Sequence, residues 1–254
     1  MVDADILIIG AGVVGLAVAE KLSDSFDNIV VADRHEKYGQ ETSSRSSEVI
    51  HAGIYYNKGT LKSLLCVRGN ELLYKICRDN NIPHSNSGKL LIANDEKSIS
   101  KLPGLFNQAK GNNAKYFRIV DEDEIREIEP NVKAKRAIYF PTSGYVDSEK
   151  LMEYFEKSAL NNGATFLYNH EVIGINRIET GYKVKFKTTH NDIYEITSKI
   201  VINSAGLHSD KIAEMAGIDA DKNGFSINYH KGIYFRAVRQ LDKYPKVLIY
   251  LVPP

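Results

Sequence analysis

The feature that most constrains the fold is a glycine pattern between an apolar strand and a helix near the N-terminus. The run Gly10–Gly15 has the form G-x-G-x-x-G. It ends a short β-branched segment, Asp5–Gly10, and opens a predicted helix over Val13–Ser23. A second apolar run, Asn28–Asp33, ends on a carboxylate 18 residues after the last glycine. A glycine-rich turn in an unrelated α/β fold is the alternative. The four features together predict a dinucleotide-binding strand–helix–strand unit.

Each part of this pattern has a physical task in holding a dinucleotide. Gly10 makes a tight turn, Gly12 lets a pyrophosphate approach the backbone, and Gly15 allows close packing of the helix on the strand. The helix N-terminus offers N–H groups and a positive partial charge to the phosphates. Asp33 can accept hydrogen bonds from a ribose 2′-hydroxyl, and its charge would repel the 2′-phosphate of NADP.

The order of segments after Asp33 favours FAD over NAD. In an NAD domain another helix and strand follow soon. Here a Ser-, Thr- and Gly-rich stretch, Gly39–Asn57, leads into a predicted long helix over Leu61–Arg78. A second strand with an Ala-Gly turn, Ile200–Gly206, appears only after a predicted three-stranded meander. This order is typical of a flavoprotein whose cofactor-binding sheet is interrupted by a substrate-binding insertion.

The other periodic segments predict alternating strands and helices. Cys66 and Cys77 would lie about 16 Å apart along the helix Leu61–Arg78, too far for a disulfide, and we expect reduced thiols on its core face. The acids of Asp121–Glu129 are expected to cap a helix rather than to bind a cation. Strands are predicted over Gly88–Ala93, Tyr116–Val120, Ala137–Phe140, Lys199–Asn203, Phe225–Val238 and Val247–Val252, and further helices over Ser98–Ala109, Ser148–Leu160 and His208–Ala216.

Charge and hydropathy argue against a nucleic-acid partner and against insertion into a membrane. The formal net charge of +1 creates no field that would gather nucleic acid or an anionic membrane surface. The apolar run Ile6–Ala19 follows Asp3 and Asp5 rather than basic residues, which argues against a signal peptide. No stretch reaches membrane-spanning length without charges. We therefore expect a cytoplasmic protein with a small-molecule substrate, no nucleic-acid partner and no integral membrane segment.

Several segments resemble a known family. They are Asp5–Asp33, Thr42–Tyr56, Leu61–Gly69, Gly88–Leu90, Gly144–Asp147, Ile202–His208 and Lys231–Tyr234. These segments resemble the D-amino-acid-oxidase superfamily of FAD-dependent oxidoreductases and are most similar to its L-2-hydroxyglutarate oxidase/dehydrogenase branch. The part His51–Tyr56 is the most specific. Two places differ from the well-characterised members, which have His-Asn-Ser-Gly at Arg45–Glu48 and Arg-Gly at Lys231–Gly232.

The resemblance implies an α/β fold with two interleaved domains. One is a Rossmann-type FAD-binding domain with a parallel sheet and a β-meander, expected over residues 1–84 and 148–222. The other is an α+β substrate domain of mostly antiparallel sheet, expected over residues 85–147 and 223–254. The family continues with a further glycine-rich strand and a segment that contacts the flavin ring. We therefore expect a chain that is truncated at its C-terminus.

The resemblance also implies which residues act on the substrate. His51 is the candidate base for a hydroxyl proton, and the alternative is that it only fixes the loop or the flavin by hydrogen bonding. Arg45, Lys231, Tyr55 and Tyr234 are candidate partners for substrate carboxylates, or else ordinary surface or sheet residues.

The remaining candidate residues are either expected to bind the cofactor or interpreted as surface and capping residues. No metal site is expected: His35, His84, His170 and His190 show no metal-ligand spacing and are interpreted as surface residues. His208 is interpreted as a helix cap, and the alternative is that it contacts the cofactor. The predicted FAD-binding residues are Gly10, Gly12, Val13, Val14, Gly15, Asp33, Arg34, Thr42, Ser43, Ser44, Ser46, Ser47, Val172, Ser204, Ala205 and Gly206.

Three functions stay open at this point. The resemblance implies oxidation of a 2-hydroxy acid, most closely L-2-hydroxyglutarate, by hydride transfer to flavin N5, with oxygen or a quinone as the open choice of electron acceptor. A related flavin enzyme acting on an amino acid or on glycerol 3-phosphate is the second. A non-catalytic nucleotide-binding remnant is the third.

Overall fold

The structure is a computed structural model that describes residues 2–235 and 244–253. The chain folds into two compact units. Unit 1 comprises Met1–Ser46 and Ser148–Ile233, and unit 2 comprises Ser47–Asp147 and Tyr234–Pro254. The sequence predicts residues 47–84 in the FAD-binding domain, but they belong to unit 2. The strands at 49–50 and 84–85 both pair with the strand at 144–146 of that unit. Residues 223–233 likewise belong to unit 1.

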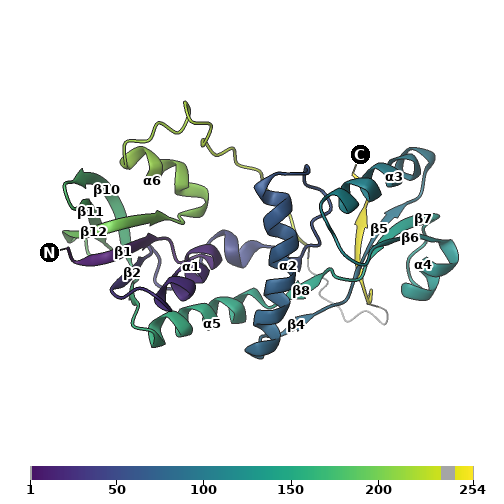
Figure 1. The fold of residues 1–254 in the computed structure, drawn as a ribbon, viewed down its shortest axis with the longest axis horizontal. Coiled ribbons are helices and arrows are strands. Elements are labelled where there is room, and N and C mark those ends of the chain that lie inside the picture. The colour runs from purple at the N-terminus through teal and green to yellow at the C-terminus, as the bar shows by residue number, and fades with distance from the viewer. Residues whose placement is uncertain (1, 236–243, 254) are drawn as a thin grey trace. The chain divides into compact units, whose positions relative to one another are not determined.

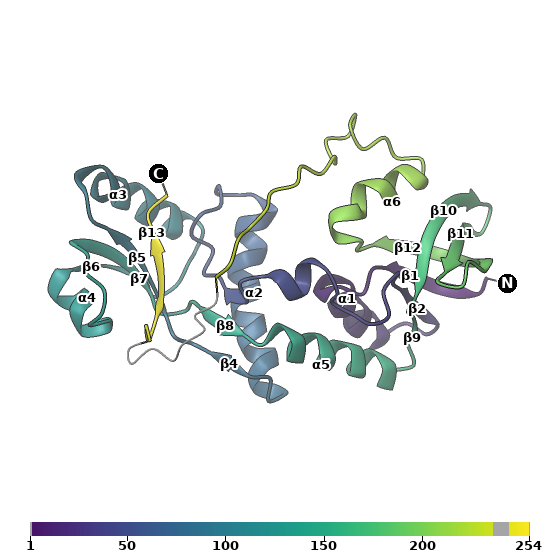
Figure 2. The same cartoon turned by 180° about the vertical axis from the view of Figure 1, so that it is seen from behind.

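Unit 1 is built on a six-stranded sheet with the strand order β10-β11-β12-β1-β2-β9 (Figure 1; β9 is labelled in Figure 2). The strand β1 pairs in parallel with β12 on one side and with β2 on the other. The part β10-β11-β12 is the antiparallel meander. The strands are β1 (Ala4–Ile9), β2 (Ile29–Ala32), β9 (Thr165–Leu167), β10 (His170–Ile178), β11 (Gly181–Thr188) and β12 (Ile193–Asn203).

The predicted strand–helix–strand start of unit 1 is confirmed. The helix α1 (Val13–Ser23) has the bounds that the sequence predicts. It lies beside α5 (Ser148–Asn161; Figure 2). The Tyr154 hydroxyl on α5 donates to Glu20 Oε1 on α1 over 3.5 Å. The shorter helical segments of unit 1 are η1 (Thr42–Arg45), η2 (Gly206–His208) and α6 (Ser209–Met215).

The strand β12 corrects one sequence prediction. Lys199–Asn203 is not a separate strand but the second half of β12. The strand stays continuous because its first half pairs with β11 and its second half with β1, and Ser198 pairs with both. The side chains of Val184 and Phe186 on β11 are fully buried, as the meander pattern predicts. They form a core with residues of β1 and β2.

Unit 2 contains a four-stranded sheet with the order β13-β5-β7-β6. Side chains alternate along a strand, so β5 (Lys89–Ala93) presents Leu91 and Ala93 to one face and Leu90 and Ile92 to the other. The first face packs against α3 (Glu96–Gly111) and the second against α4 (Glu122–Ile128). The other strands are β6 (Arg118–Asp121), β7 (Arg136–Phe140) and β13 (Leu248–Leu251).

A second, small sheet and a long helix complete unit 2. The sheet has the order β3-β8-β4, with β3 (Val49–Ile50), β8 (Gly144–Val146) and β4 (His84–Ser85). The helix α2 (Leu61–Asp79) follows the predicted range. Asp121 caps α4 by accepting a hydrogen bond from the Glu124 N–H over 3.1 Å, which confirms the capping role of that acidic run. Among the described residues, none of the helices combines the length and the hydropathy that crossing a bilayer requires.

The buried face of α2 is not the one that its leucines predict. Leu61, Leu64, Leu65 and Leu72 are exposed, and the buried residues are Ser63, Asn70, Tyr74 and Cys77. Tertiary hydrogen bonds favour this orientation, because the Asn70 side-chain amide donates to the carbonyls of His51 (3.1 Å) and Thr142 (2.8 Å). Both cysteines are free thiols, Cys77 buried and Cys66 only half-buried.

The predicted strand Phe225–Val238 is wrong over residues 225–235, which have no strand structure, and its last three residues lie outside the described residues. The segment is apolar enough for a strand, but residues 225–233 make no ladder with the sheet of unit 1. The other C-terminal strand is confirmed: β13 pairs in parallel with β5.

Candidate functional site

The glycine turn after β1 holds three segments of unit 1 together. Gly10 has a φ of +103°, and a Cβ there would lie 2.5 Å from the carbonyl oxygen of Ser204. A Cβ at Gly15 would lie 1.9 Å from the carbonyl oxygen of Gly10. Since no real side chain tolerates these distances, both positions require glycine. The turn and close-packing tasks predicted for them are therefore confirmed.

Asp33, just after β2, is fixed by the backbone beside this turn. One carboxylate oxygen accepts a hydrogen bond from the Ala11 N–H over 2.7 Å, and the other accepts from the His35 N–H over 2.9 Å. A carboxylate has about four lone-pair positions, so these two bonds leave acceptor capacity for a ribose hydroxyl. Asp33 thus shapes the turn and can still bind a ligand.

The end of β12 lies at the same edge of the sheet. The Ser204 N–H donates to the carbonyl of Ile9 over 2.8 Å, and Ala205 and Gly206 follow directly, with Gly206 at a φ of +54°. The parallel strands β1, β2 and β12 therefore all end where the predicted cofactor residues lie. In open α/β sheets this carboxyl edge is where ligands bind.

The start of α1 is open to an anion. Its N-cap is Gly12, which has no side chain, and its first turn contains no acidic residue. The Val13 N–H is satisfied by Ser43 Oγ at 3.0 Å, so η1 lies against this turn. The other first-turn N–H groups, those of Val14 and Gly15, have no intrahelical acceptor. A helix start of this kind favours a phosphate.

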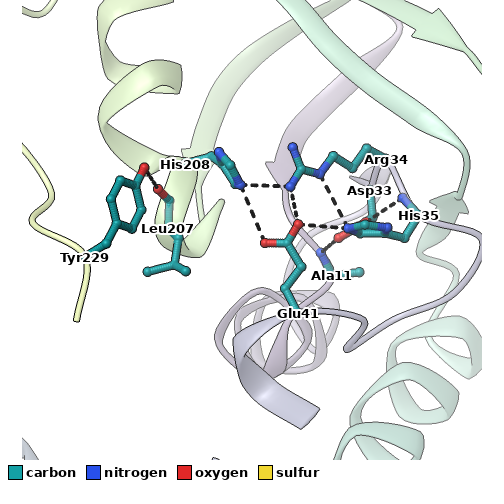
Figure 3. Close-up of polar contacts among 8 residues, drawn as sticks. All are labelled: Ala11, Asp33, Arg34, His35, Glu41, Leu207, His208 and Tyr229. Atoms are coloured by element: carbon teal, nitrogen blue, oxygen red, sulfur yellow. Dashed lines mark hydrogen bonds and ion pairs between the residues drawn. The ribbon is translucent and has the colours of Figure 1, made fainter. Parts of the chain in front are cut away.

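A polar cluster that the sequence did not predict surrounds Glu41 (Figure 3). Glu41 forms ion pairs with Arg34 and with His35, the latter at 2.9 Å. Burial alone would raise the Glu41 pKa, but hydrogen bonds from His35 and Arg34 lower it below its ordinary value. Arg34 is therefore already neutralised by a carboxylate, and a cofactor phosphate would have to compete with Glu41 for it.

His208 occupies the N-cap position of α6, but its side chain belongs to this cluster. Its side chain makes no capping hydrogen bond at the start of α6. Its Nε2 lies 2.8 Å from Arg34 Nη2 and 3.7 Å from Glu41 (Figure 3). The capping role expected for the His208 side chain was wrong because a local position before a helix cannot show that β12 and β2 end on either side of β1. No spacing in the sequence distinguishes Glu41 from an ordinary loop acid.

His51 follows β3 in unit 2, held through its backbone. Its carbonyl accepts hydrogen bonds from the Asn70 side-chain amide at 3.1 Å and from Cys66 Sγ at 3.6 Å. Burial and the nearby charge of Lys89 lower the pKa of its imidazole. His51 is therefore a neutral imidazole near pH 7, which can accept a proton.

Lys89 is an unusual residue for the interior of a sheet. It is 0% exposed, and its Nζ makes no hydrogen bond to any described residue. By strand alternation it points to the same face as Leu91. Its Nζ lies 5.1 Å from the ring centre of Tyr55, 5.6 Å from that of Phe140 and 5.0 Å from that of Tyr250. Burial lowers the pKa of Lys89 to about 8, an effect that Cys66 opposes.

Lys89→Met is expected to stabilise the fold at pH 7 by up to about 3 kcal/mol, because 1.36 kcal/mol accompanies each unit of a pKa shift. The folded-state pKa of about 8 lies below the ordinary 10.5, so the unfolded chain binds more protons between these two pH values. The unfolding free energy of the wild type should therefore rise from pH 8 to pH 10.5 relative to that of the variant. Urea unfolding of both proteins across this range measures the difference. A constant difference would contradict a depressed pKa.

The family is decided by the sequence as a whole. Residues 5–253 match the profile of the family described as FAD dependent oxidoreductase. The chain belongs to this family. The predicted D-amino-acid-oxidase resemblance and α/β fold are therefore confirmed, and FAD is the cofactor of the family.

Two similar proteins are named for different substrates. The chain is 36% identical to the mitochondrial L-2-hydroxyglutarate dehydrogenase of Arabidopsis thaliana, over 91% of this chain and 53% of that protein. It is 30% identical to a glycerol 3-phosphate dehydrogenase of Caloramator mitchellensis, over 98% of this chain and 50% of that protein. The chain thus spans about half the length of these curated relatives.

A solved oxidase with bound FAD has the same fold. The L-alpha-glycerophosphate oxidase of Mycoplasma pneumoniae, reduced with dithionite and with FAD bound, superposes with a TM-score of 0.84 at 22% identity. The superposition covers 98% of this chain and 65% of that one. The open helix start, the glycine turn and the Asp33 carboxylate of unit 1 fit the ADP half of FAD.

The other predicted residues are spread over both units. Arg45 ends η1, exposed, with its Nη1 2.8 Å from Ser44 Oγ. Lys231 and Tyr234 are exposed in the extended segment 225–235. The side chain of Val172 lies in the core of unit 1. Of the remaining predicted cofactor residues, Thr42 and Ser44 lie in η1, and Ser46 and Ser47 follow it.

Among the described residues, no group of three or more His, Cys, Asp or Glu side chains is placed to hold a metal ion.

Proposed function

We propose that this chain serves the oxidation of a small 2-hydroxy acid, L-2-hydroxyglutarate, to 2-oxoglutarate. The observation that carries the proposal is the 36% identity to a relative named for this substrate, which extends over the segment with His51. Since the chain spans about half of that relative, the activity of the whole protein is part of the proposal. Bound FAD supplies the hydride acceptor, flavin N5.

In this proposal unit 1 holds the ADP half of the cofactor and His51 handles the proton. The α1 N-terminus and the Gly12 backbone bind the pyrophosphate, and Asp33 accepts from the ribose. His51 Nδ1 or Nε2 takes the proton of the substrate hydroxyl group, for which its lowered pKa keeps it unprotonated at pH 7. Arg45, Lys231 and Tyr234 are the proposed partners of the substrate carboxylates.

Glycerol 3-phosphate is the second candidate substrate. The relative from Caloramator mitchellensis, 30% identical over 98% of this chain, is named for it. Both substrates carry a hydroxyl group next to an anionic end, so the same proton acceptor would serve either one. The cytoplasm stays our proposed location, and the electron acceptor stays open between oxygen and a quinone.

Anaerobic flavin reduction separates these candidates. We expect L-2-hydroxyglutarate to bleach the absorbance of the FAD-loaded protein near about 450 nm, a property of flavins in general. The D-enantiomer is the matched control and should bleach it far more slowly. Bleaching by glycerol 3-phosphate or by an amino acid, without bleaching by L-2-hydroxyglutarate, would reject the proposed substrate. A protein that binds no FAD would be the nucleotide-binding remnant.

A further inference from the structure

Among the described residues, four buried side-chain atoms of unit 2 lack a hydrogen-bond partner, and two of them are donors on side chains that contact each other; the other two are Asn112 Oδ1 and Ser143 Oγ. The Nζ of Lys89 and the hydroxyl of Tyr55 are buried, and neither bonds to any described residue. They belong to neighbouring side chains, since Nζ lies 5.1 Å from the ring centre of Tyr55. An unpartnered buried polar group costs free energy, and a buried charge costs more. A ligand that accepts hydrogen bonds and carries negative charge would satisfy both groups at once.

We propose that Lys89 Nζ and the Tyr55 hydroxyl bind the anionic end of the substrate. Under the proposed function, on which this inference rests, that end is one carboxylate of a 2-hydroxy dicarboxylate. Lys89 supplies the charge and Tyr55 a hydrogen bond from its hydroxyl. Aromatic rings surround Nζ, so Tyr55 or Tyr250 must change rotamer to admit the anion.

The surroundings of Lys89 are compatible with an added negative charge. The titratable groups that face it are Tyr55, Tyr250, Cys66 and the imidazole of His51. Burial, followed by the effect of Tyr250, raises the pKa of Tyr55 to about 12, so its hydroxyl keeps the proton that it donates. Burial likewise raises the pKa of the Cys66 thiol. Among the described residues Lys89 has no salt bridge, so a bound anion would meet no competing carboxylate there.

The test follows the protonation of Lys89 directly. In protein with ¹³Cε-labelled lysine, the Lys89 resonance is identified by its absence in Lys89→Met. Its titration midpoint should lie near pH 8 in the free protein. Saturating glutarate should raise it by about one unit or more, because a tenfold preference of the anion for the charged lysine moves the midpoint by one unit.

Binding measurements on variants complete the test. By calorimetry, Lys89→Met is expected to weaken glutarate binding about 10- to 100-fold and Tyr55→Phe about tenfold. The matched control is Lys62→Met, which removes an exposed lysine whose Nζ lies 5.8 Å from the ring centre of Tyr56. It should leave the affinity unchanged. Tyr55→Phe keeps the ring and the lysine charge, so it tests the hydroxyl independently of Lys89.

The outcomes separate this inference from the proposed function. If glycerol 3-phosphate shifts the Lys89 midpoint and glutarate does not, the anion site stands and the proposed substrate fails. If wild type and Lys89→Met bind glutarate equally, the role of Lys89 fails while the proposed substrate class stands. If neither anion at millimolar concentration moves the midpoint, Lys89 is a structural cation enclosed by aromatic rings and the inference is overturned.

Discussion

Replacing His51 by alanine is expected to slow flavin reduction by substrate about 10²–10⁴-fold, while the substrate dissociation constant changes far less. The variant loses the group that takes the hydroxyl proton. It keeps the interactions of the carbonyl at position 51 with Asn70 and Cys66, because those are made by the backbone. Anaerobic stopped-flow measurement over a series of substrate concentrations separates the limiting rate from the binding constant.

A matched control and a pH profile make this prediction specific. His190→Ala removes an exposed histidine from unit 1 and should leave both constants unchanged. In the wild type the rate should rise as pH rises through the lowered pKa of His51 and be level at pH 7. Lys89→Met removes the charge that helps to lower this pKa, so the rising limb should move to higher pH. An unchanged rate in His51→Ala together with weakened flavin binding would give His51 a structural role only.

The local parts of the fold could be predicted from the sequence. The helix α1 has the predicted bounds because its start is fixed by glycines that are neighbours in the chain. Turn residues and period-two alternation predict the meander. The buried face of α2 could not be predicted, since its leucines follow helical spacing while the hydrogen bonds of Asn70 to distant carbonyls favour another face.

The polar parts of the candidate site depend on contacts between distant segments. Glu41 meets His208 only because β12 and β2 end on either side of β1. Lys89 directly precedes an apolar run, a place where a lysine usually marks the exposed end of a strand. Its burial follows from pairing with β7 on one side and β13 on the other. No pattern within the segment indicates that both neighbours are present.

The substitution with the clearest steric consequence in unit 1 is Gly15→Ala. An added Cβ would lie 1.9 Å from the Gly10 carbonyl oxygen and 3.3 Å from Ser204 Cβ. Rotating a flexible side chain relieves neither contact. The first is to the backbone of the turn, and the second is to a Cβ, which side-chain rotation does not move. We expect a loss of about 3 kcal/mol or more in the unfolding free energy of unit 1, at the upper end of overpacking costs.

FAD binding should fall together with stability in this variant, because the displaced turn carries the Gly12 backbone and the start of α1. We expect about 100-fold weaker binding, which is a loss of about 2.8 kcal/mol in binding free energy, since each 1.4 kcal/mol is a factor of ten. Gly69→Ala in α2 is the matched control: it is also a helical glycine, and its added Cβ meets nothing within 4 Å. That change should stabilise the protein by about 0.5–1 kcal/mol, because alanine loses less chain entropy than glycine in a helix. Urea unfolding and flavin fluorescence titration of both variants measure the two effects. Wild-type FAD affinity in Gly15→Ala would show that the close approach of α1 to the turn is not needed to hold the cofactor.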